Sequence, residues 1–424
     1  MLPTGAVTPA DEAGGFLSRS AVVGVYAPAL CFEIGIGAIT PMIAVRAVEL
    51  GATLGIAGLL AGLLAVGQIV ADAPAGALAA RIGDRRAMLL AAGLTAVALA
   101  ACALVGNLAL LGVAILVTGA GNAVFALARQ AYLIEITPPI FRARALSTLG
   151  GLGRIGLFVG PFLGAAAIHA GGTVAAFWLA LVVTVVTGVV VLLVPDVAGH
   201  DERRAAGPPV SLWRVLTDHR TLYATLGLAI LLVGATRSAR TVVIPLWGEH
   251  LGLAPAATSL VFGLSGAVDT AVFYPAGKLM DRKGRLWVAV PSMVALGLSI
   301  AVLPLARTVG WFALVAMVMG LANGIGAGLI MTLGADVAPR AVRAQFLGVW
   351  RLFSDAGGAA GPLVVAAGAA LGSLAGGIVV AGGLGLVAAG ALARTVPRWS
   401  VHANARTRAA AGLLPDGRAA VAPP

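Results

Sequence analysis

The segment PAGALAARIGDRR (residues 74–86) joins two long apolar runs, and a close copy, PAGKLMDRKGRLW (275–287), joins two more. The copies begin 201 residues apart, and the same spacing separates Asn122 from Asn323. A constant spacing over different residue types predicts two halves that repeat one structural unit. Further pairs at this spacing are Gly83 and Gly284, Gly119 and Gly320, Pro138 and Pro339, and Gly160-Pro161 and Gly361-Pro362.

The composition excludes a water-soluble domain. Of the 424 residues, 60% are hydrophobic and only 11% are charged, and the mean hydropathy is +1.00. Soluble domains carry about a quarter charged residues. A net charge of +11 would suggest nucleic acid in a soluble chain, but here the charges lie mainly in short gaps between apolar runs. We therefore expect a lipid bilayer as the partner and no nucleic acid.

The apolar runs have the length of membrane-spanning helices. A helix needs roughly 20 apolar residues to cross the hydrocarbon core, and the runs lack the two-residue alternation of a barrel strand. The sequence therefore predicts an all-α membrane protein with two pseudo-symmetric bundles of six transmembrane helices. The predicted spans are 20–43, 54–79, 87–105, 108–133, 146–169, 173–195, 221–246, 256–280, 286–306, 310–336, 345–371 and 373–393.

The polar stretches divide the twelve predicted spans into two bundles. The longest internal one, residues 196–220, is predicted to be a linker between the halves, and the end of the chain shows no apolar period and is predicted to be a loose tail. The predicted organisation is an N-terminal tail (1–19), a bundle (20–195), a linker (196–220), a second bundle (221–393) and a C-terminal tail (394–424).

Arginine and lysine placement predicts the orientation. Sixteen of these residues fall in the even-numbered gaps, with Arg129 among them, and only Arg46 and Arg307 fall in the odd-numbered gaps. Cytoplasmic loops carry the excess of positive charge. We therefore expect a multi-pass protein of the cell (cytoplasmic) membrane with both termini in the cytoplasm.

The repeated loop resembles the signature G-x-L-x-D-R-x-G-R/K of the major facilitator superfamily, and the resemblance extends from span 1 to span 12. The second half carries it in full, as Gly277, Leu279, Asp281, Arg282, Gly284 and Arg285. The first half keeps Gly76, Gly83, Asp84 and Arg85 but has Ala80 at the acidic position. The resemblance implies a loop that latches neighbouring helix ends, and a secondary transporter with alternating access.

Span 5 carries Gly156, Gly160, Pro161 and Gly164, which resembles the signature of the drug:proton antiporter branch. Small residues four apart also allow two helices to approach closely, so helix packing alone explains the pattern equally well. The usual arginine of that branch is missing from span 4, where Ile115 stands four residues before Gly119.

Ionisable residues inside the predicted spans are candidates for function, because each costs about 2.5–3.5 kcal/mol or more at the bilayer centre. A structural ion pair is the alternative explanation for each. The residues are Glu33, Asp72, Arg154, Arg237, Arg240, Asp269, Arg351 and Asp355.

Glu33 is the candidate proton carrier, because removal from water disfavours the charged form of a carboxylate. Arg237 and Arg240 lie three residues apart and share a helix face, where they can neutralise Glu33 or bind an anionic substrate. Asn122 and Asn323 are candidates for the cavity wall, with helix packing as the alternative.

Four of the charged residues suggest gates. Asp72 and Arg351 lie at the cytoplasmic ends of spans 2 and 11, which face each other in the resembled fold. We therefore expect Asp72 and Arg351 to pair, and, by the repeat, Arg154 with Asp269. Asp355, one turn after Arg351, is grouped with these gating residues.

These residues favour transport over catalysis. The five histidines are scattered without metal-ligand spacing, and neither lysine follows a Walker pattern, so we expect no enzyme, metal or cofactor. The leading hypothesis is a monomeric, proton-coupled exporter of a small organic molecule. The alternatives are an importer or facilitator of a metabolite such as a sugar or organic anion, and a receptor-like protein that transports nothing.

Overall fold

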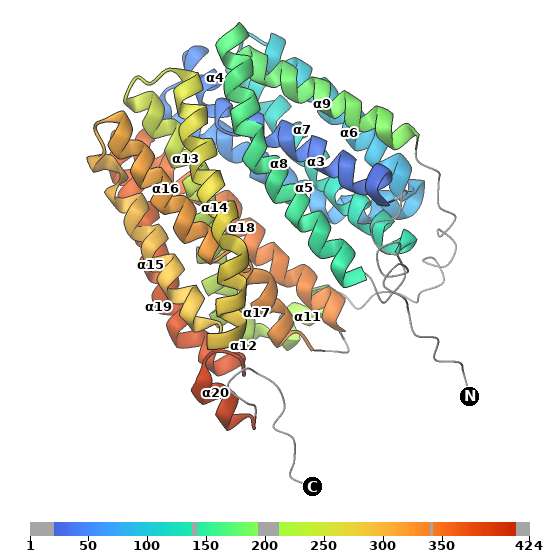
Figure 1. Cartoon of the computed structure of the whole chain (residues 1–424), viewed down its shortest axis with the longest axis vertical. Helices are drawn as coiled ribbons and strands as arrows, with labels where there is room; N and C mark the ends of the chain where they lie inside the picture. Colours follow the sequence, from blue (N-terminus) through green and yellow to red (C-terminus); the bar gives the residue numbers. More distant parts are fainter. Residues whose placement is uncertain (1–20, 138–141, 194–211, 340–341, 413–424) are drawn as a thin grey trace. The chain divides into compact units, whose positions relative to one another are not determined.

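The computed structural model describes residues 21–137, 142–193, 212–339 and 342–412 (Figure 1). The regular elements in these ranges are all helical, and twelve of the helices are long and apolar enough to cross a membrane. Continuous helices satisfy their backbone groups internally, as a bilayer requires. The predicted fold class is therefore confirmed.

The chain folds as two compact units, and the first comprises Met1–Thr40 and Val66–Gly207. Within it α3 lies against α8 and α9, while α6 lies against α7 and α9. Its elements are η1 (Val22–Tyr26), α3 (Ala27–Ile39), the second part of α5 (Leu54–Ile82), α6 (Asp84–Leu104), α7 (Leu108–Ile136), α8 (Arg142–Gly171) and α9 (Val174–Leu192).

The second unit comprises Pro41–Ala65 and Pro208–Pro424. Within it α13 lies against α18, α14 against α16, and α15 against α19. Its elements are α4 (Met42–Glu49), the first part of α5, α11 (Leu212–Asp218), α12 (Arg220–Leu222), η3 (Tyr223–Gly227), α13 (Leu228–His250), α14 (Pro255–Lys283), α15 (Leu286–Val302), η4 (Leu303–Leu305), α16 (Val309–Ile325), α17 (Leu329–Val337), α18 (Arg343–Ala370), α19 (Leu374–Trp399) and α20 (Ala405–Ala410).

The boundary between the units falls inside the predicted first bundle. Residues 41–65 belong to the second unit, because glycines on α5 place that helix directly against α18. A Cβ atom added at Gly55 would lie 3.0 Å from the backbone nitrogen of Ala370, and one at Gly62 would lie 3.1 Å from the Cβ of Pro362. The division at residues 196–220, whose described part includes α11, stays a prediction.

Two glycines of the repeated loop have the same backbone conformation. Gly83 and Gly284 both have φ of +99°, a region that residues with a side chain rarely adopt. Each glycine lies between two long helices, α5 and α6 in the first unit and α14 and α15 in the second. Equal backbone geometry at the 201-residue spacing is what a structural repeat would produce.

Span 10 is broken, although the sequence predicts one continuous helix over 310–336. It consists of α16 and α17, and residues 326–328 (Gly-Ala-Gly) form a turn between them. Glycine is a poor helix former because it loses the most backbone entropy on folding. The break leaves the last carbonyl groups of α16 available to side chains.

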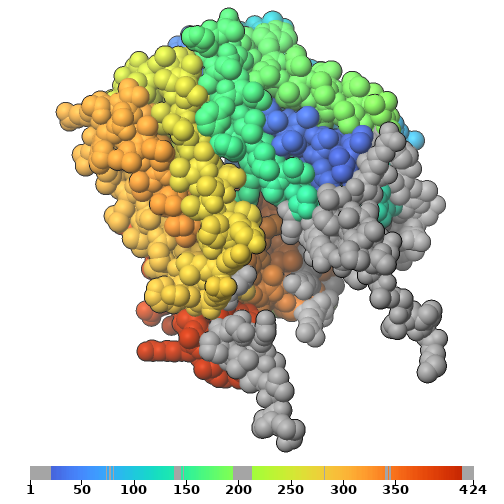
Figure 2. Space-filling model, in the orientation of Figure 1, coloured from blue at the N-terminus to red at the C-terminus, as the bar shows by residue number. Residues whose placement is uncertain are grey.

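The part of the C-terminal tail that the structure describes is folded, which corrects the expectation of a loose tail. The last span continues to Trp399, and the chain then turns back onto the junction between α14 and α15. The backbone nitrogens of Arg285 and Leu286 donate to the carbonyl oxygens of His402 and Ala403, both at 3.0 Å. Because these backbone bonds depend little on side-chain type, hydropathy could not reveal them. Figures 1 and 2 show this C-terminal end, in red, at one end of the second unit.

Candidate functional site

Buried ion pairs of the membrane-spanning helices are found in both units of the described chain. In the first unit Arg129, on α7, donates from Nη2 to Oε1 of Glu33, on α3, at 2.6 Å. Both side chains are only 10% exposed. The predicted proton carrier therefore has an ionic partner, which comes from a helix 96 residues further along the chain.

Small and aromatic residues hold this pair in place. The ring of Phe125, one turn before Arg129, stacks on Phe32 with a centroid distance of 4.3 Å, and the guanidinium carbon of Arg129 lies 5.7 Å from the Phe125 centroid. On the other side Gly156 of α8 lies so close that a Cβ atom there would be 2.6 Å from the Cβ of Glu33. The carboxylate is therefore held between α7 and α8.

The ion pair leaves hydrogen-bonding capacity unused. Nε and Nη1 of Arg129, and Oδ1 of Asn122 two turns earlier on α7, are buried without a hydrogen-bond partner in the described part of the chain. Buried polar groups are normally paired, and leaving one unpaired costs about 1–3 kcal/mol. This cluster can therefore accept a further polar group.

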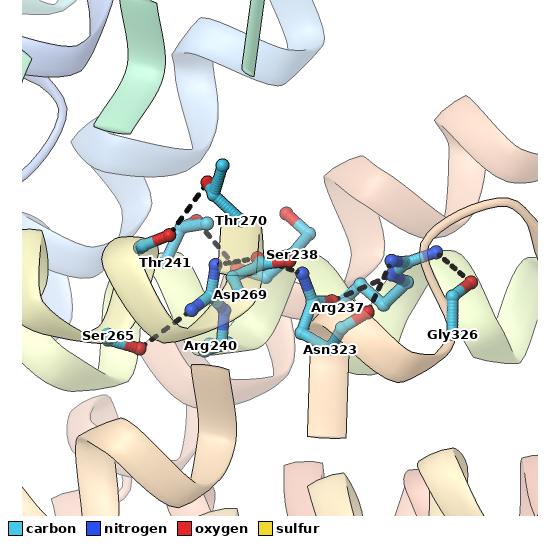
Figure 3. Close-up of polar contacts among 10 residues, drawn as sticks. Arg237, Ser238, Arg240, Thr241, Ser265, Asp269, Thr270, Asn323 and Gly326 are labelled. Atoms are coloured by element: carbon cyan, nitrogen blue, oxygen red, sulfur yellow. Dashed lines mark hydrogen bonds and ion pairs between the residues drawn. The ribbon is translucent and has the colours of Figure 1, made fainter. Parts of the chain in front are cut away.

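The second unit holds a longer chain of polar contacts (Figure 3). Oδ2 of Asp269, on α14, accepts from Nη2 of Arg240 at 3.1 Å and from Nδ2 of Asn323 at 2.6 Å. Arg240 also donates to Oγ of Ser265 at 2.7 Å, and the amide oxygen of Asn323 accepts from Nε of Arg237 at 2.8 Å. The network thus connects α13, α14 and α16.

Arg237 also caps the helix end at the break in span 10. Its guanidinium donates to the carbonyl oxygens of Asn323 at 3.0 Å and Gly326 at 3.2 Å, at the C-terminal end of α16. This end of a helix carries a partial negative charge, which a cation stabilises. The arginine therefore serves both the broken helix and the network around Asp269.

The predicted gating residues differ in their exposure and in their contacts. Arg351 bonds to Asp355 one turn along α18, at 3.3 Å, with its side chain 59% exposed. Asp72 and Arg154 are half-buried on α5 and α8 of the first unit. Asp269 is bound within the second unit by Arg240. Pairing of Asp72 with Arg351, and of Arg154 with Asp269, stays a prediction.

The loop residues make specific contacts in each unit. In the first, Arg85 donates to the carbonyl oxygens of Val191 and Leu192, at 3.3 and 2.7 Å, at the end of α9. In the second, Arg285 forms an ion pair with Asp336 at 3.0 Å. Asp84 is buried, Arg282 is exposed, and an added Cβ at Gly277 would meet open space. The surroundings of Gly76 and of the Asp281 carboxylate lie outside what the structure describes.

The antiporter-like glycines form a packing surface. Gly156, Gly160 and Gly164 of α8 face the backbone of α3, where added Cβ atoms would meet Leu30, Ile34 and Ala38. Pro161 lies inside the same helix. The equivalent Gly357 and Gly361 of α18 lie in the same way against α13. Helix packing therefore accounts for these glycines in both halves.

Sequence reasoning missed three partners of the charged residues. Arg129 lies inside the predicted span 108–133, close enough to its end to group with the loop charges, and its seven-residue spacing from Asn122 places both on one helix face. Ser265 lies one turn before Asp269 on the same face of α14. Asp336 lies at the very end of the predicted span 310–336, and no spacing or motif in the sequence indicates that it pairs with Arg285.

Twelve membrane-spanning candidates in an all-helical chain define a polytopic membrane protein, with buried ionisable residues in both of its units. The sequence profile of the Major Facilitator Superfamily matches residues 29–362. The chain belongs to this family of membrane transporters, and it is not an enzyme.

Solved structures share this fold at low sequence identity. The nucleoside transporter NupG has 14% identity and a TM-score of 0.68, covering 89% of this chain and 99% of NupG; a mutant form of NupG has 13% identity and a TM-score of 0.71, covering 89% and 100%. The human organic anion transporter MFSD10 (TETRAN) has 18% identity and a TM-score of 0.60, covering 88% and 99%. No curated protein matches by sequence. At these identities the similarity is one of fold.

Proposed function

We propose that this chain is a proton-coupled secondary transporter of a small anionic organic molecule. The observation that carries the proposal is the buried pair of Glu33 and Arg129, in which two donor groups of the arginine have no partner among the described residues. We further propose that the protein acts as a monomer in the cytoplasmic membrane with both termini in the cytoplasm, as the arginine and lysine distribution favours.

Protonation of Glu33 would change the charge balance around Arg129. A proton neutralises the carboxylate, and a buried guanidinium without a counter-charge is costly. An anionic group of the substrate can then bind Arg129 with charge-assisted hydrogen bonds. Because such coupling is reciprocal, the proton and the anion would favour each other's binding, and both would cross the membrane in the same direction.

The charge of the two clusters also supports an anionic substrate. Arg129 pairs with Glu33 and Arg240 with Asp269, while the half-buried Arg237 donates to neutral oxygens of Asn323 and Gly326. Arginine side chains in such positions favour negative or electron-rich groups. The names of the similar structures, nucleoside and organic anion transporters, are compatible with this class, although their fold alone does not select a substrate.

Export by proton antiport is the second candidate. It rests on the glycine pattern of Gly156, Gly160 and Gly164 in α8, which resembles the antiporter signature. In that mechanism a substrate would bind the deprotonated Glu33 and compete with the proton. The packing of these glycines against α3 explains the pattern without antiport, and for this reason we place export second.

The sign of a pH change in proteoliposomes distinguishes the two. The purified chain is reconstituted with a pH-sensitive dye in the lumen, and membrane-impermeant sulfonates and carboxylates, nucleosides and amphipathic amines are added outside in turn. Co-transport with protons acidifies the lumen, whereas antiport makes it alkaline. This sign does not depend on which way the protein is inserted. Liposomes without protein give the baseline for passive diffusion.

Glu33→Gln tests the coupling residue. We expect the variant to lose the pH change while it still exchanges labelled substrate for unlabelled substrate. The control is Glu49→Gln on α4, which removes a partly exposed acid that pairs with Arg46 at 3.3 Å. A pH change that persists in Glu33→Gln would refute the role of Glu33. An alkaline lumen in the wild type would favour the exporter instead.

A further inference from the structure

The folded C-terminal segment forms one wall of a groove at the junction of α14 and α15. Arg408 anchors the segment: it is 2% exposed, and its Nη1 donates to the carbonyl oxygen of Arg282 at 2.8 Å. Asn404, which precedes α20, closes a capping box with Thr407. The segment is therefore held against the junction by both backbone and side-chain bonds.

The groove itself is apolar. It has a volume of about 350 Å³ and is lined by Leu286, Trp287, Val290 and Pro291 of α15 and by Asn404 of the C-terminal segment. Small-molecule sites have volumes of about 300–1,000 Å³, so the groove is large enough for part of a ligand. An apolar lining favours a hydrocarbon chain over a soluble ion.

The position of the groove along the helices corresponds to the membrane surface. The candidate spans end at Met280 and begin again at Leu286, so Trp287 is the second residue of its span. Trp287 is 58% exposed, and the ammonium nitrogen of Lys283 lies 5.1 Å from its ring centroid. Tryptophan at the end of a span typically lies among the lipid headgroups.

A positive charge lies beside the groove. Lys283 is exposed, and its ammonium group lies against the ring of Trp287, a lining residue. Arg285, by contrast, is buried and bound to Asp336. Positive side chains next to a span attract anionic lipids. A molecule that fits both the apolar lining and the positive charge of Lys283 has a hydrocarbon chain and a negative headgroup.

We propose that this groove is a binding site for one anionic phospholipid. The phosphate would lie at Lys283, and one acyl chain would lie along Trp287, Val290 and Pro291. The docked C-terminal segment completes the site through Asn404. This proposal does not depend on the transported substrate or on the direction of transport.

Native mass spectrometry of the full-length protein in detergent tests the site. Dioleoyl phosphatidylglycerol, dioleoyl phosphatidylcholine and soluble glycerol phosphate are titrated separately. We expect one phosphatidylglycerol molecule to bind about fivefold more tightly than phosphatidylcholine, which is the effect of roughly one juxtamembrane cation. Glycerol phosphate, which lacks the chains, should not bind.

Two variants separate the headgroup contact from the groove. Lys283→Gln should remove the preference for phosphatidylglycerol, and Trp287→Ala should weaken both lipids. The control, Arg214→Gln, removes an exposed arginine on α11 next to the exposed Trp213, and it should bind both lipids as the wild type does. Unchanged phosphatidylglycerol binding in Lys283→Gln, equal binding of the two lipids by the wild type, or binding of glycerol phosphate would overturn the proposal. Lys283 is exposed, so its variant should fold normally, and thermal unfolding checks this.

Discussion

Asp336, at the end of α17, accepts two hydrogen bonds from the guanidinium of Arg285, from Nε at 3.0 Å and from Nη2 at 3.2 Å. The hydroxyl of Ser400 donates to the same carboxylate at 2.8 Å. One acidic side chain thereby joins the loop after α14, the broken span 10 and the C-terminal segment. Two-point contacts between arginine and carboxylate are among the strongest hydrogen-bonded pairs.

Ser400→Ala should destabilise the second unit by about 1.5–3 kcal/mol, the usual range for a hydrogen bond to a charged group. The loss should appear as a lower midpoint of thermal unfolding in detergent. Ser299→Ala is the matched control, because the Ser299 hydroxyl bonds only to the Leu296 carbonyl of its own helix. Equal midpoints for the two variants would contradict a structural role for the C-terminal segment.

Gly284→Ala should be more damaging than Gly252→Ala. Gly284 has φ of +99° and ψ of +166°, a region that essentially only glycine adopts, so alanine there carries backbone strain of about 1–3 kcal/mol. Gly252 has φ of +68°, where alanine costs about 1–2 kcal/mol. At Gly284 the new Cβ would also lie 2.6 Å from the carbonyl oxygen of Ala403, whereas nothing lies within 4 Å at Gly252. Gly284→Ala should therefore lower the midpoint of thermal unfolding more than Gly252→Ala does. Equal midpoints for the two variants would contradict both the special backbone at Gly284 and its contact with the C-terminal segment.

Two adjacent glycines of α18 should respond oppositely to alanine. At Gly357 the new methyl group would collide with the carbonyl oxygen of Leu231 on α13, at a cost of about 1–3 kcal/mol. At Gly358 it would meet nothing within 4 Å, and alanine should be neutral or stabilise the helix by up to about 1 kcal/mol. Thermal unfolding of the two single variants checks this. A loss at Gly358 as large as at Gly357 would argue against the packing of α18 on α13.

Removal of one member of the Arg240 and Asp269 pair should cost more than removal of both. Arg240→Met leaves the buried Asp269 charge with only the amide of Asn323, and such a loss typically costs about 3–5 kcal/mol. The double variant Arg240→Met, Asp269→Leu removes both charges of the pair and should recover much of the stability. Unfolding midpoints of the wild type, the single variants and the double variant form the cycle.

The exposed pair on α18 is the control for this cycle. Arg351 and Asp355 are 59% and 30% exposed, and an i,i+4 pair of this kind contributes about 0.3–0.5 kcal/mol. Arg351→Ala should therefore change the midpoint little. Additive losses in the Arg240 and Asp269 cycle would show that the two charges do not depend on each other.

The number of spans and the repeat were predictable because both are local properties of the chain. A bilayer selects for apolar runs of fixed length, and such runs can be counted without knowing which helix touches which. The turn glycines Gly83 and Gly284 belong to the same category, since a positive φ between two helices requires glycine wherever the helices lie.

The pairing of charges depended on the tertiary structure. The partner of Glu33 is Arg129, 96 residues away, and within the second unit Asp269 pairs with Arg240. A helix face can be read from spacing, but which helix packs against that face depends on the small residues of both, such as Gly156 next to Glu33.

The amino-acid sequence alone thus determined twelve apolar helices, their repeat and the glycines of the turns, because hydropathy and backbone sterics act residue by residue. Only the tertiary structure decided that span 10 breaks beside Arg237, and that the chain after Trp399 folds back onto Arg285 and Leu286. Those features depend on individual hydrogen bonds between segments that are distant in the sequence. Such bonds form only after packing has brought the segments together.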